Sequence, residues 1–137
     1  RRLKLWVGVA TLSLLPSRAV PCICATNSIQ VEFKKAAAVF VGEVSSFRTI
    51  DEHRSMAQVK VLKVWKGVES LEQLEILTDR PSSNDCSGVL SKGTYLIYAL
   101  KEGQLLATWP CMRTRLLKDA GEDLKALGPG RVPRGVR

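Results

Sequence analysis

The chain has little of the chemistry that most enzymes use. Its 137 residues include a single histidine, His53, which stands among charged neighbours and is expected to be a solvated loop residue. The sequence contains none of the fingerprints of serine hydrolases, zinc proteases, phosphate-binding loops or dinucleotide-binding folds. We therefore expect a protein that is not an enzyme and that needs no cofactor.

Long apolar runs are also missing. The run from Leu5 to Leu15 falls well short of the roughly 20 residues that cross a bilayer. Basic residues at positions 1, 2 and 4 precede it, and a proline and the small-x-small triplet Ser17–Ala19 follow it. This order is typical of a signal peptide. We expect residues 1–19 to be removed and the protein to be secreted, extracellular or periplasmic, with no stable membrane anchor.

The basic charge lies mainly outside the predicted domain. Residues 1–19 hold four of the 21 basic side chains and no acidic one, so their removal lowers the formal net charge from +8 to +4. Three more arginines fall in residues 129–137, which are predicted to be a disordered basic tail. Binding of single-stranded nucleic acid needs a basic stripe with stacking aromatics. Core packing explains the Trp and Tyr residues better, and we expect no nucleic-acid partner.

Four cysteines in a secreted chain are expected to form two disulfides. Cys22 and Cys24 are too close in sequence to pair without closing a small strained ring. Each is therefore expected to pair with Cys86 or Cys111, which leaves two patterns open. A zinc site made of these thiolates is disfavoured, because Cys86 and Cys111 stand alone rather than in C-x-x-C pairs.

The hydrophobic pattern predicts two helices and five strands. One helix covers Ser28–Lys35, with Asn27 as its N-cap and Gln30 as capping-box partner, and the other covers Thr114–Leu127 and stops at Gly128. The predicted strands are Ala38–Val44, Met56–Trp65, Leu74–Thr78, Thr94–Leu100 and Leu105–Trp109.

Details of the strands can also be predicted. Gly42 is expected to mark a bulge or sharp bend, and Phe47–Ser55 a loop. In the second strand, Ala57, Val59, Val61 and Lys63 are expected to share one face. Five short strands with a flanking helix fit a closed barrel or a sandwich, and the five-stranded oligonucleotide/oligosaccharide-binding (OB) barrel is a compact solution.

Several short segments carry a further signal through their order and spacing. They are Cys22-Ile23-Cys24, residues 33–44, residues 59–67, the loop 78–86 with Gly88, residues 95–99, and Cys111 before the last helix. Together they resemble the netrin-like domain of the tissue inhibitors of metalloproteinases, in its short single-domain form. The resemblance implies a mainly β, OB-fold-like barrel over residues 20–128, with a short N-terminal helix and a C-terminal helix. It also implies disulfides between Cys22 and Cys86 and between Cys24 and Cys111.

The resemblance further implies a secreted inhibitor whose partner is a zinc metalloprotease. In the family, the α-amine and carbonyl oxygen of an N-terminal cysteine chelate the zinc of the protease, and the next side chain enters the specificity pocket. Here those roles fall to Cys22 and Ile23. Cys22, Ile23 and Cys24 together form the ridge that blocks the active-site cleft of the protease. Ser83, Asn84 and Asp85 are implied to widen the contact with the protease.

The mature N-terminus decides between this activity and an alternative. Cleavage after Ala19 would leave Val20 and Pro21 ahead of Cys22 and turn the chelating amine into an amide, which does not ligate zinc. Lys34 also stands where the family has a further cysteine. The alternative is a non-inhibitory, secreted netrin-like module that binds a protein partner through the barrel surface.

Overall fold

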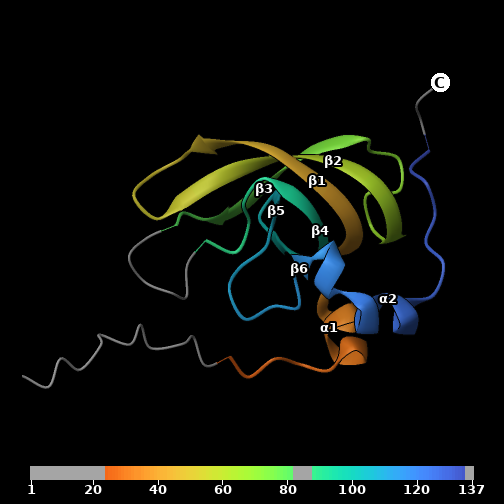
Figure 1. The fold of residues 1–137 in the computed structure, drawn as a ribbon. Helices are drawn as coiled ribbons and strands as arrows, with labels where there is room; N and C mark the ends of the chain where they lie inside the picture. The colour runs from red at the N-terminus through yellow and green to blue at the C-terminus, as the bar shows by residue number, and fades with distance from the viewer. Residues whose placement is uncertain (1–23, 82–87, 135–137) are drawn as a thin grey trace, which may run out of the picture.

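The computed structural model describes residues 24–81 and 88–134, which form a mainly β fold with two short helices beside a barrel (Figure 1). The helices are α1 (Ile29–Lys35) and α2 (Gly121–Leu127), with a 3₁₀ turn at Leu117–Asp119. The strands are β1 (Ala38–Thr49), β2 (Arg54–Lys66), β3 (Gln73–Asp79), β4 (Gly93–Glu102), β5 (Leu105–Ala107) and β6 (Arg115–Leu116). The predicted fold class, a five-stranded OB-fold-like barrel with two helices, is confirmed.

The barrel closes because β1 has neighbours on both sides. Strand order is β1-β2-β3-β5-β4, and β4 pairs with β1 again, from Ala38 opposite Ala99 to Val44 opposite Gly93. The β3–β5 pair is parallel and the other pairs are antiparallel. Closure removes the exposed edges that an open five-stranded sheet would present.

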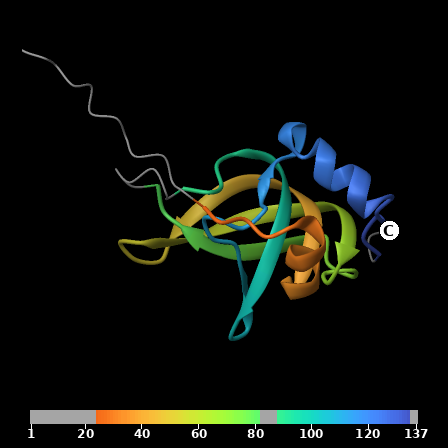
Figure 2. The same ribbon diagram turned by 90° about the horizontal axis from the view of Figure 1, so that it is seen from below.

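Apolar side chains fill both the inside of the barrel and the layer beneath the helices. The first part of β1, Ala38–Gly42, and the middle of β4, Tyr95–Ala99, are buried on both faces, since α1 and α2 lie against their outer side (Figure 2). The interior cluster includes Phe40, Val44, Ala57, Val59, Val61, Val64, Ile76 and Ile97. The outer cluster includes Val39, Val41, Leu96 and Tyr98, with Phe33 and Leu124 packed against it.

A bulge in β2 changes which residues face the core. Val41 pairs with Lys63 and Gly42 pairs with Val61, so Leu62 is an extra residue in β2. The bulge places Val64 in the core and leaves Lys63 exposed, and the prediction that Lys63 continues the apolar face is wrong. The predicted irregularity at Gly42 is confirmed by the register shift at this position.

The β1–β2 hairpin is longer than predicted. Phe47–Thr49 continue β1, paired with Ser55–Ala57, so the predicted loop 47–55 shrinks to 50–53. Backbone pairing with buried Ser55–Ala57 extends β1 through Phe47–Thr49, which are exposed and have no apolar alternation. In the remaining turn, the Asp51 carboxylate accepts hydrogen bonds from the backbone amides of His53 and Arg54 at 2.9 and 2.8 Å. His53 is exposed, as predicted.

The helix starts differ from the prediction. Ser28, not Asn27, caps α1, because its hydroxyl accepts a hydrogen bond from the Val31 amide. The Asn27 side chain instead donates to Glu32.

The last helix is shorter than the predicted 114–127. Arg115 and Leu116 pair with β4, and α2 begins only at Gly121, which therefore lies at the helix start and not in its middle. Gly128 ends the helix as predicted, with a φ of 74°.

The segment 129–134 is not a free tail. Val64 and Arg131 form a two-residue antiparallel bridge, and the Arg134 amide donates to the Glu69 carbonyl at 2.9 Å. The prediction of a disordered tail is thus corrected for residues 129–134. Within the described ranges, no helix is both long and apolar enough to cross a bilayer.

Candidate functional site

Most of the predicted protease-binding residues lie outside the described ranges. This applies to Cys22 and Ile23, to the loop residues Ser83, Asn84 and Asp85, and to Cys86, so the Cys22–Cys86 disulfide stays a prediction. The structure describes the residues next to them. These are Cys24, which directly follows Ile23, and Pro81 and Gly88 at the two ends of the loop.

A disulfide joins Cys24 to Cys111, and their Cα atoms are 5.0 Å apart. This is one of the two pairings that the family resemblance implied. Cys111 lies in the turn after β5, with a φ of 73°, in a region that residues other than glycine rarely adopt. The bond therefore fastens the last residue of the C-x-C motif to a tight turn at the barrel.

A buried ion pair holds the same segment from a second side. The Arg113 guanidinium donates to both carboxylate oxygens of Asp123, each at 2.7 Å, and to the carbonyl oxygen of Asn27 at 3.2 Å. The Tyr98 hydroxyl also donates to Asp123, at 2.7 Å. Residues 24–28 are thereby connected to β4 and α2 as well as to Cys111.

The electrostatics of this network favour the charged pair. Burial alone would raise the pKa of Asp123, but the hydrogen bonds from Arg113 and Tyr98 and the nearby positive charge together lower it below its usual value. Burial, followed by the hydrogen bond to Asp123, raises the pKa of Tyr98. The hydrogen bond to Asp123 likewise raises the pKa of Arg113. Near neutral pH the network therefore contains a carboxylate, a guanidinium and a neutral phenol.

The turn that carries Cys111 is fixed at both of its ends. The hydroxyl groups of Thr108 and Thr114 donate to the carbonyl oxygen of Tyr98, at 3.0 and 3.1 Å, and lie 2.7 Å from each other. The backbone amide of Tyr98 donates to the Thr114 hydroxyl at 2.9 Å. Because Thr114 is bonded to the backbone of β4, the two residues that follow it pair with β4 and do not begin the predicted helix.

Asp79 holds the base of the loop that was predicted to contact the protease. Its carboxylate accepts hydrogen bonds from the backbone amides of Gly88, at 2.6 Å, and Val89, at 3.4 Å. Gly88 has a φ of 77°, and a Cβ atom there would lie 3.2 Å from the Cα atom of Pro81. The two ends of residues 82–87 are therefore fixed to each other and to the end of β3.

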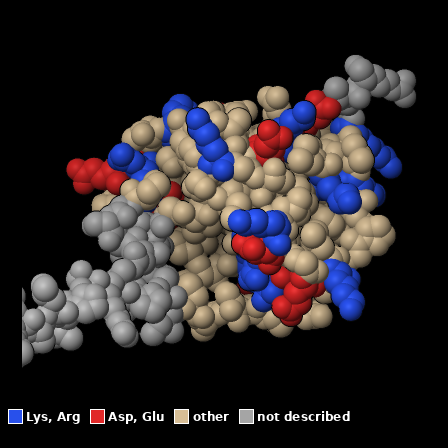
Figure 3. Space-filling model, viewed as in Figure 1, with Lys and Arg blue, Asp and Glu red and all other residues tan. Residues whose placement is uncertain are grey.

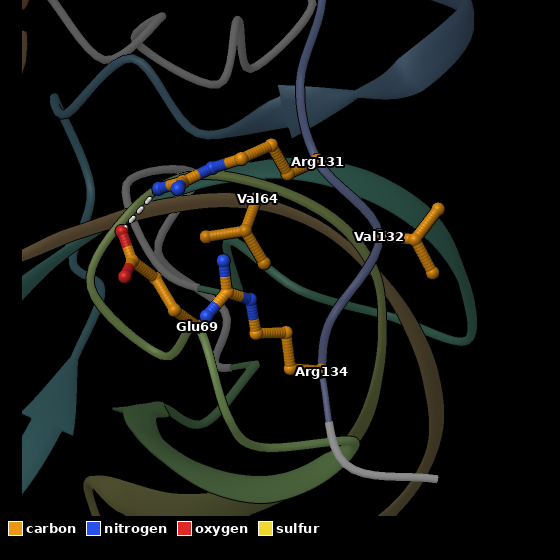
Figure 4. A pocket seen from close by; sticks show the side chains of 5 residues that line it. All are labelled: Val64, Glu69, Arg131, Val132 and Arg134. Carbon is orange, nitrogen blue, oxygen red and sulfur yellow. Dashed lines mark hydrogen bonds and ion pairs between the residues drawn. The ribbon is translucent and has the colours of Figure 1, made fainter. Parts of the chain in front are cut away.

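An open hollow between α1 and α2 holds about 520 Å³ and is lined by Ser28, Ile29, Gln30, Arg113, Glu122, Lys125 and Ala126. Other features of the described residues indicate no metal site and no basic stripe. The cavity lined by Val64, Glu69, Arg131, Val132 and Arg134 holds about 20 Å³, roughly the space of one water (Figure 4). No group of three or more potential metal ligands occurs in the described ranges. Lys and Arg are interspersed with Asp and Glu on the face shown in Figure 3, which argues against a continuous basic stripe there.

Sequence patterns did not reveal the residues that position the N-terminal segment. Arg113 and Asp123 form no motif, and a charged residue in a polar stretch is normally exposed. One signal was present: Arg113 follows Cys111 by two residues, so the disulfide brings it close to the N-terminal segment.

No family model and no curated protein matches the chain.

Proposed function

We propose that the protein is a secreted inhibitor of zinc metalloproteases, which blocks the active-site cleft with the ridge Cys22–Cys24. We infer further that it is a short relative of the netrin-like domain of the tissue inhibitors of metalloproteinases. The OB-fold-like barrel supports this inference because it is the fold that the resemblance implied.

One observation carries the proposal: the Cys24–Cys111 disulfide ties the end of the ridge to the barrel. An inhibitor that presents main-chain atoms to a metal needs them held in place before binding, because ordering a free segment on binding lowers affinity. The contact from Arg113 to the Asn27 carbonyl oxygen adds a second support three residues beyond Cys24. A structural disulfide also fits secretion into an oxidising compartment.

The proposed mechanism uses main-chain atoms of Cys22. Its free α-amine and its carbonyl oxygen bind the zinc of the protease and displace the water that would attack a peptide bond. Ile23 then occupies the apolar specificity pocket. Asp79 and Gly88 fix the base of the loop that carries Ser83–Asp85, the second part of the contact.

The test varies the first residue of the mature chain. Forms that begin at Cys22, at Val20, and at one alanine placed before Cys22 are compared as inhibitors of a panel of zinc metalloprotease catalytic domains. We expect inhibition from the Cys22 form and a loss of at least about 100-fold in the alanine-extended form, since an amide nitrogen does not replace the amine. Carbamylation of the α-amine is expected to have the same effect.

The control is the melting temperature of the three forms, which should agree because all three contain the whole of residues 24–134, which include the described barrel. Equal inhibition by all three forms would rule out chelation by the amine. Failure of the Cys22 form against every protease tested would leave the non-inhibitory interaction module as the function, which the Val20-Pro21 extension favours.

A further inference from the structure

The last residues of β2 pair with a different segment from the rest of the strand. Strand β3 pairs with β2 only from Arg54 to Lys60. Farther along, Val64 and Arg131 exchange two backbone hydrogen bonds, with N–O distances of 2.7 and 2.8 Å. Residues 128–134, which we name the C-terminal strap, thus occupy an edge that β3 leaves free (Figures 1 and 4).

Three further contacts hold the strap. The indole N–H of Trp65 donates to the Gly128 carbonyl oxygen at 2.8 Å, and the Arg134 amide donates to the Glu69 carbonyl oxygen at 2.9 Å. The Arg131 guanidinium forms an ion pair with the Glu69 carboxylate (Figure 4). The edge therefore offers an acidic group beside the position that pairs with Val64.

The position of Gly130 beside β2 leaves no room for a side chain. A Cβ atom on Gly130 would lie 2.5 Å from the Cγ of Lys63 and 2.9 Å from the Cε2 of Trp65. A side chain at this position would push both neighbours aside. A segment that binds in this register consequently needs glycine directly before its arginine.

Two prolines limit how well the strap itself binds. In an antiparallel ladder every second residue presents its N–H to the same neighbour, so Pro129 and Pro133 are the next positions that would pair with β2 on either side of Arg131. Proline has no N–H to donate. The ion pair is largely exposed, with 62% and 55% of the two side chains accessible, and exposed pairs contribute little. Val132 is 77% exposed, so its burial adds little too.

We propose that the β2 edge from Leu62 to Lys66 is a strand-addition site for an extended segment of a partner protein. That segment has Gly-Arg at its centre and no proline two residues to either side of the arginine. The strap is the weak intramolecular occupant of this site. Its short connection to α2 gives it an effective concentration in the millimolar range, which keeps weaker ligands out. A second copy of the chain brings the same prolines and gains no extra pairing.

The test measures the binding of three heptapeptides to the full chain. NMR signals of the Val64 and Leu62 amides report the binding. GPGRVPR copies the strap, GTGRVTR replaces both prolines with threonine, and GTVRVTR also replaces the glycine. We expect GTGRVTR to bind at least about tenfold more tightly than GPGRVPR, and GTVRVTR to show no binding. The variant Arg131→Glu, in which Glu69 repels the strap, should bind GTGRVTR about tenfold more tightly than the native chain, because the tethered competitor is weakened.

Equal affinity for the three peptides would show that binding is not strand addition in this register. No binding of GTGRVTR to either the native chain or the Arg131→Glu variant would overturn the site. Lys125→Glu, a charge reversal of the same sign on an exposed face of α2, is the matched control and should bind GTGRVTR as the native chain does. None of these results depends on protease inhibition.

Discussion

Arg113 and Asp123 face each other inside the protein, joined by two hydrogen bonds of 2.7 Å. The Asp123 side chain has no exposed surface and the Arg113 side chain only 10%. Two charges this far from water are tolerated only together, because removing one leaves the other buried without a counter-charge. The pair joins the turn next to Cys111 to α2, and so links the anchoring of the N-terminal segment to the packing of the last helix.

Replacing Asp123 with asparagine should destabilise the fold strongly. The change leaves the buried guanidinium unpaired, and we expect the free energy of unfolding to fall by about 3–5 kcal/mol. Urea denaturation followed by tryptophan fluorescence measures it. The control is Asp119→Asn, since Asp119 is exposed nearby in the chain and its loss should change the value by less than about 0.5 kcal/mol. Equal effects of the two changes would contradict a stabilising role for the pair.

Stability should decline in acid because of the same carboxylate. The pKa of Asp123 is lower in the folded protein than its ordinary 3.8, so protons bind the unfolded chain more readily. The contribution of Asp123 is therefore complete well above pH 3.8 and is lost as the pH falls below that value toward the folded pKa. The difference in unfolding free energy between the native chain and Asp123→Asn, measured from pH 7 to pH 2, should shrink in this window. A difference that is constant with pH would refute the assignment.

Replacing Gly42 and Gly121 with alanine should change the stability of the fold in opposite directions. At Gly42 a Cβ atom would lie 2.3 Å from Val59 Cγ1 inside the barrel, and we expect Gly42→Ala to destabilise by about 1–3 kcal/mol. At Gly121 nothing lies within 4 Å of the added atom, and Gly121→Ala should stabilise by about 0.5 kcal/mol by restricting the unfolded chain. The melting temperatures of the two glycine variants test both expectations. Stabilisation by Gly42→Ala would mean that the barrel is open at this point.

Removing the described disulfide should affect both stability and the N-terminal segment. Cys24 and Cys111 are 87 residues apart, and the loop entropy that their bond removes from the unfolded chain is worth about 4.6 kcal/mol. We expect the double variant Cys24→Ser/Cys111→Ser to lose roughly this much. Hydrogen exchange should rise most at the Glu32 amide, which bonds to the Ser28 carbonyl oxygen in the first turn of α1, and less at buried Ile97, which serves as the internal control. Uniform loss of protection would show that the bond supports the whole barrel instead of anchoring one segment.

The sequence predicted the strands well because their apolar alternation is strong. It placed each barrel strand and the stop at Gly128, because burial and backbone conformation leave direct traces in residue type. It missed the Leu62 bulge, which a pattern of period two does not reveal because Leu62 itself is apolar. It also misassigned Arg115 and Leu116 to a helix, since their pairing with β4 depends on contacts of Thr114 that are distant in sequence.

The candidate site was harder to predict than the barrel. The cysteines indicated which segment is anchored, but the buried polar groups that support it, Arg113 and Asp123, look like ordinary surface residues in the sequence. Their roles arise from three-dimensional neighbours that are brought together only when the barrel closes. The C-terminal strap was missed for the same reason: Arg131 resembles a solvated tail residue until Val64 and Glu69 are placed beside it.

The pairing of β1 with β4 also determines the order in which the chain can mature. Ala38 meets Ala99 only after the intervening strands have been synthesised and brought together, and contacts so distant in sequence form slowly, on the scale of milliseconds to seconds. Cys24 precedes β1 and Cys111 follows β5, so strand closure is what brings the two thiols together. Thiol oxidation takes seconds to hours and therefore follows closure. On these time scales we expect the Cys24–Cys111 bond to form in a barrel that has already closed.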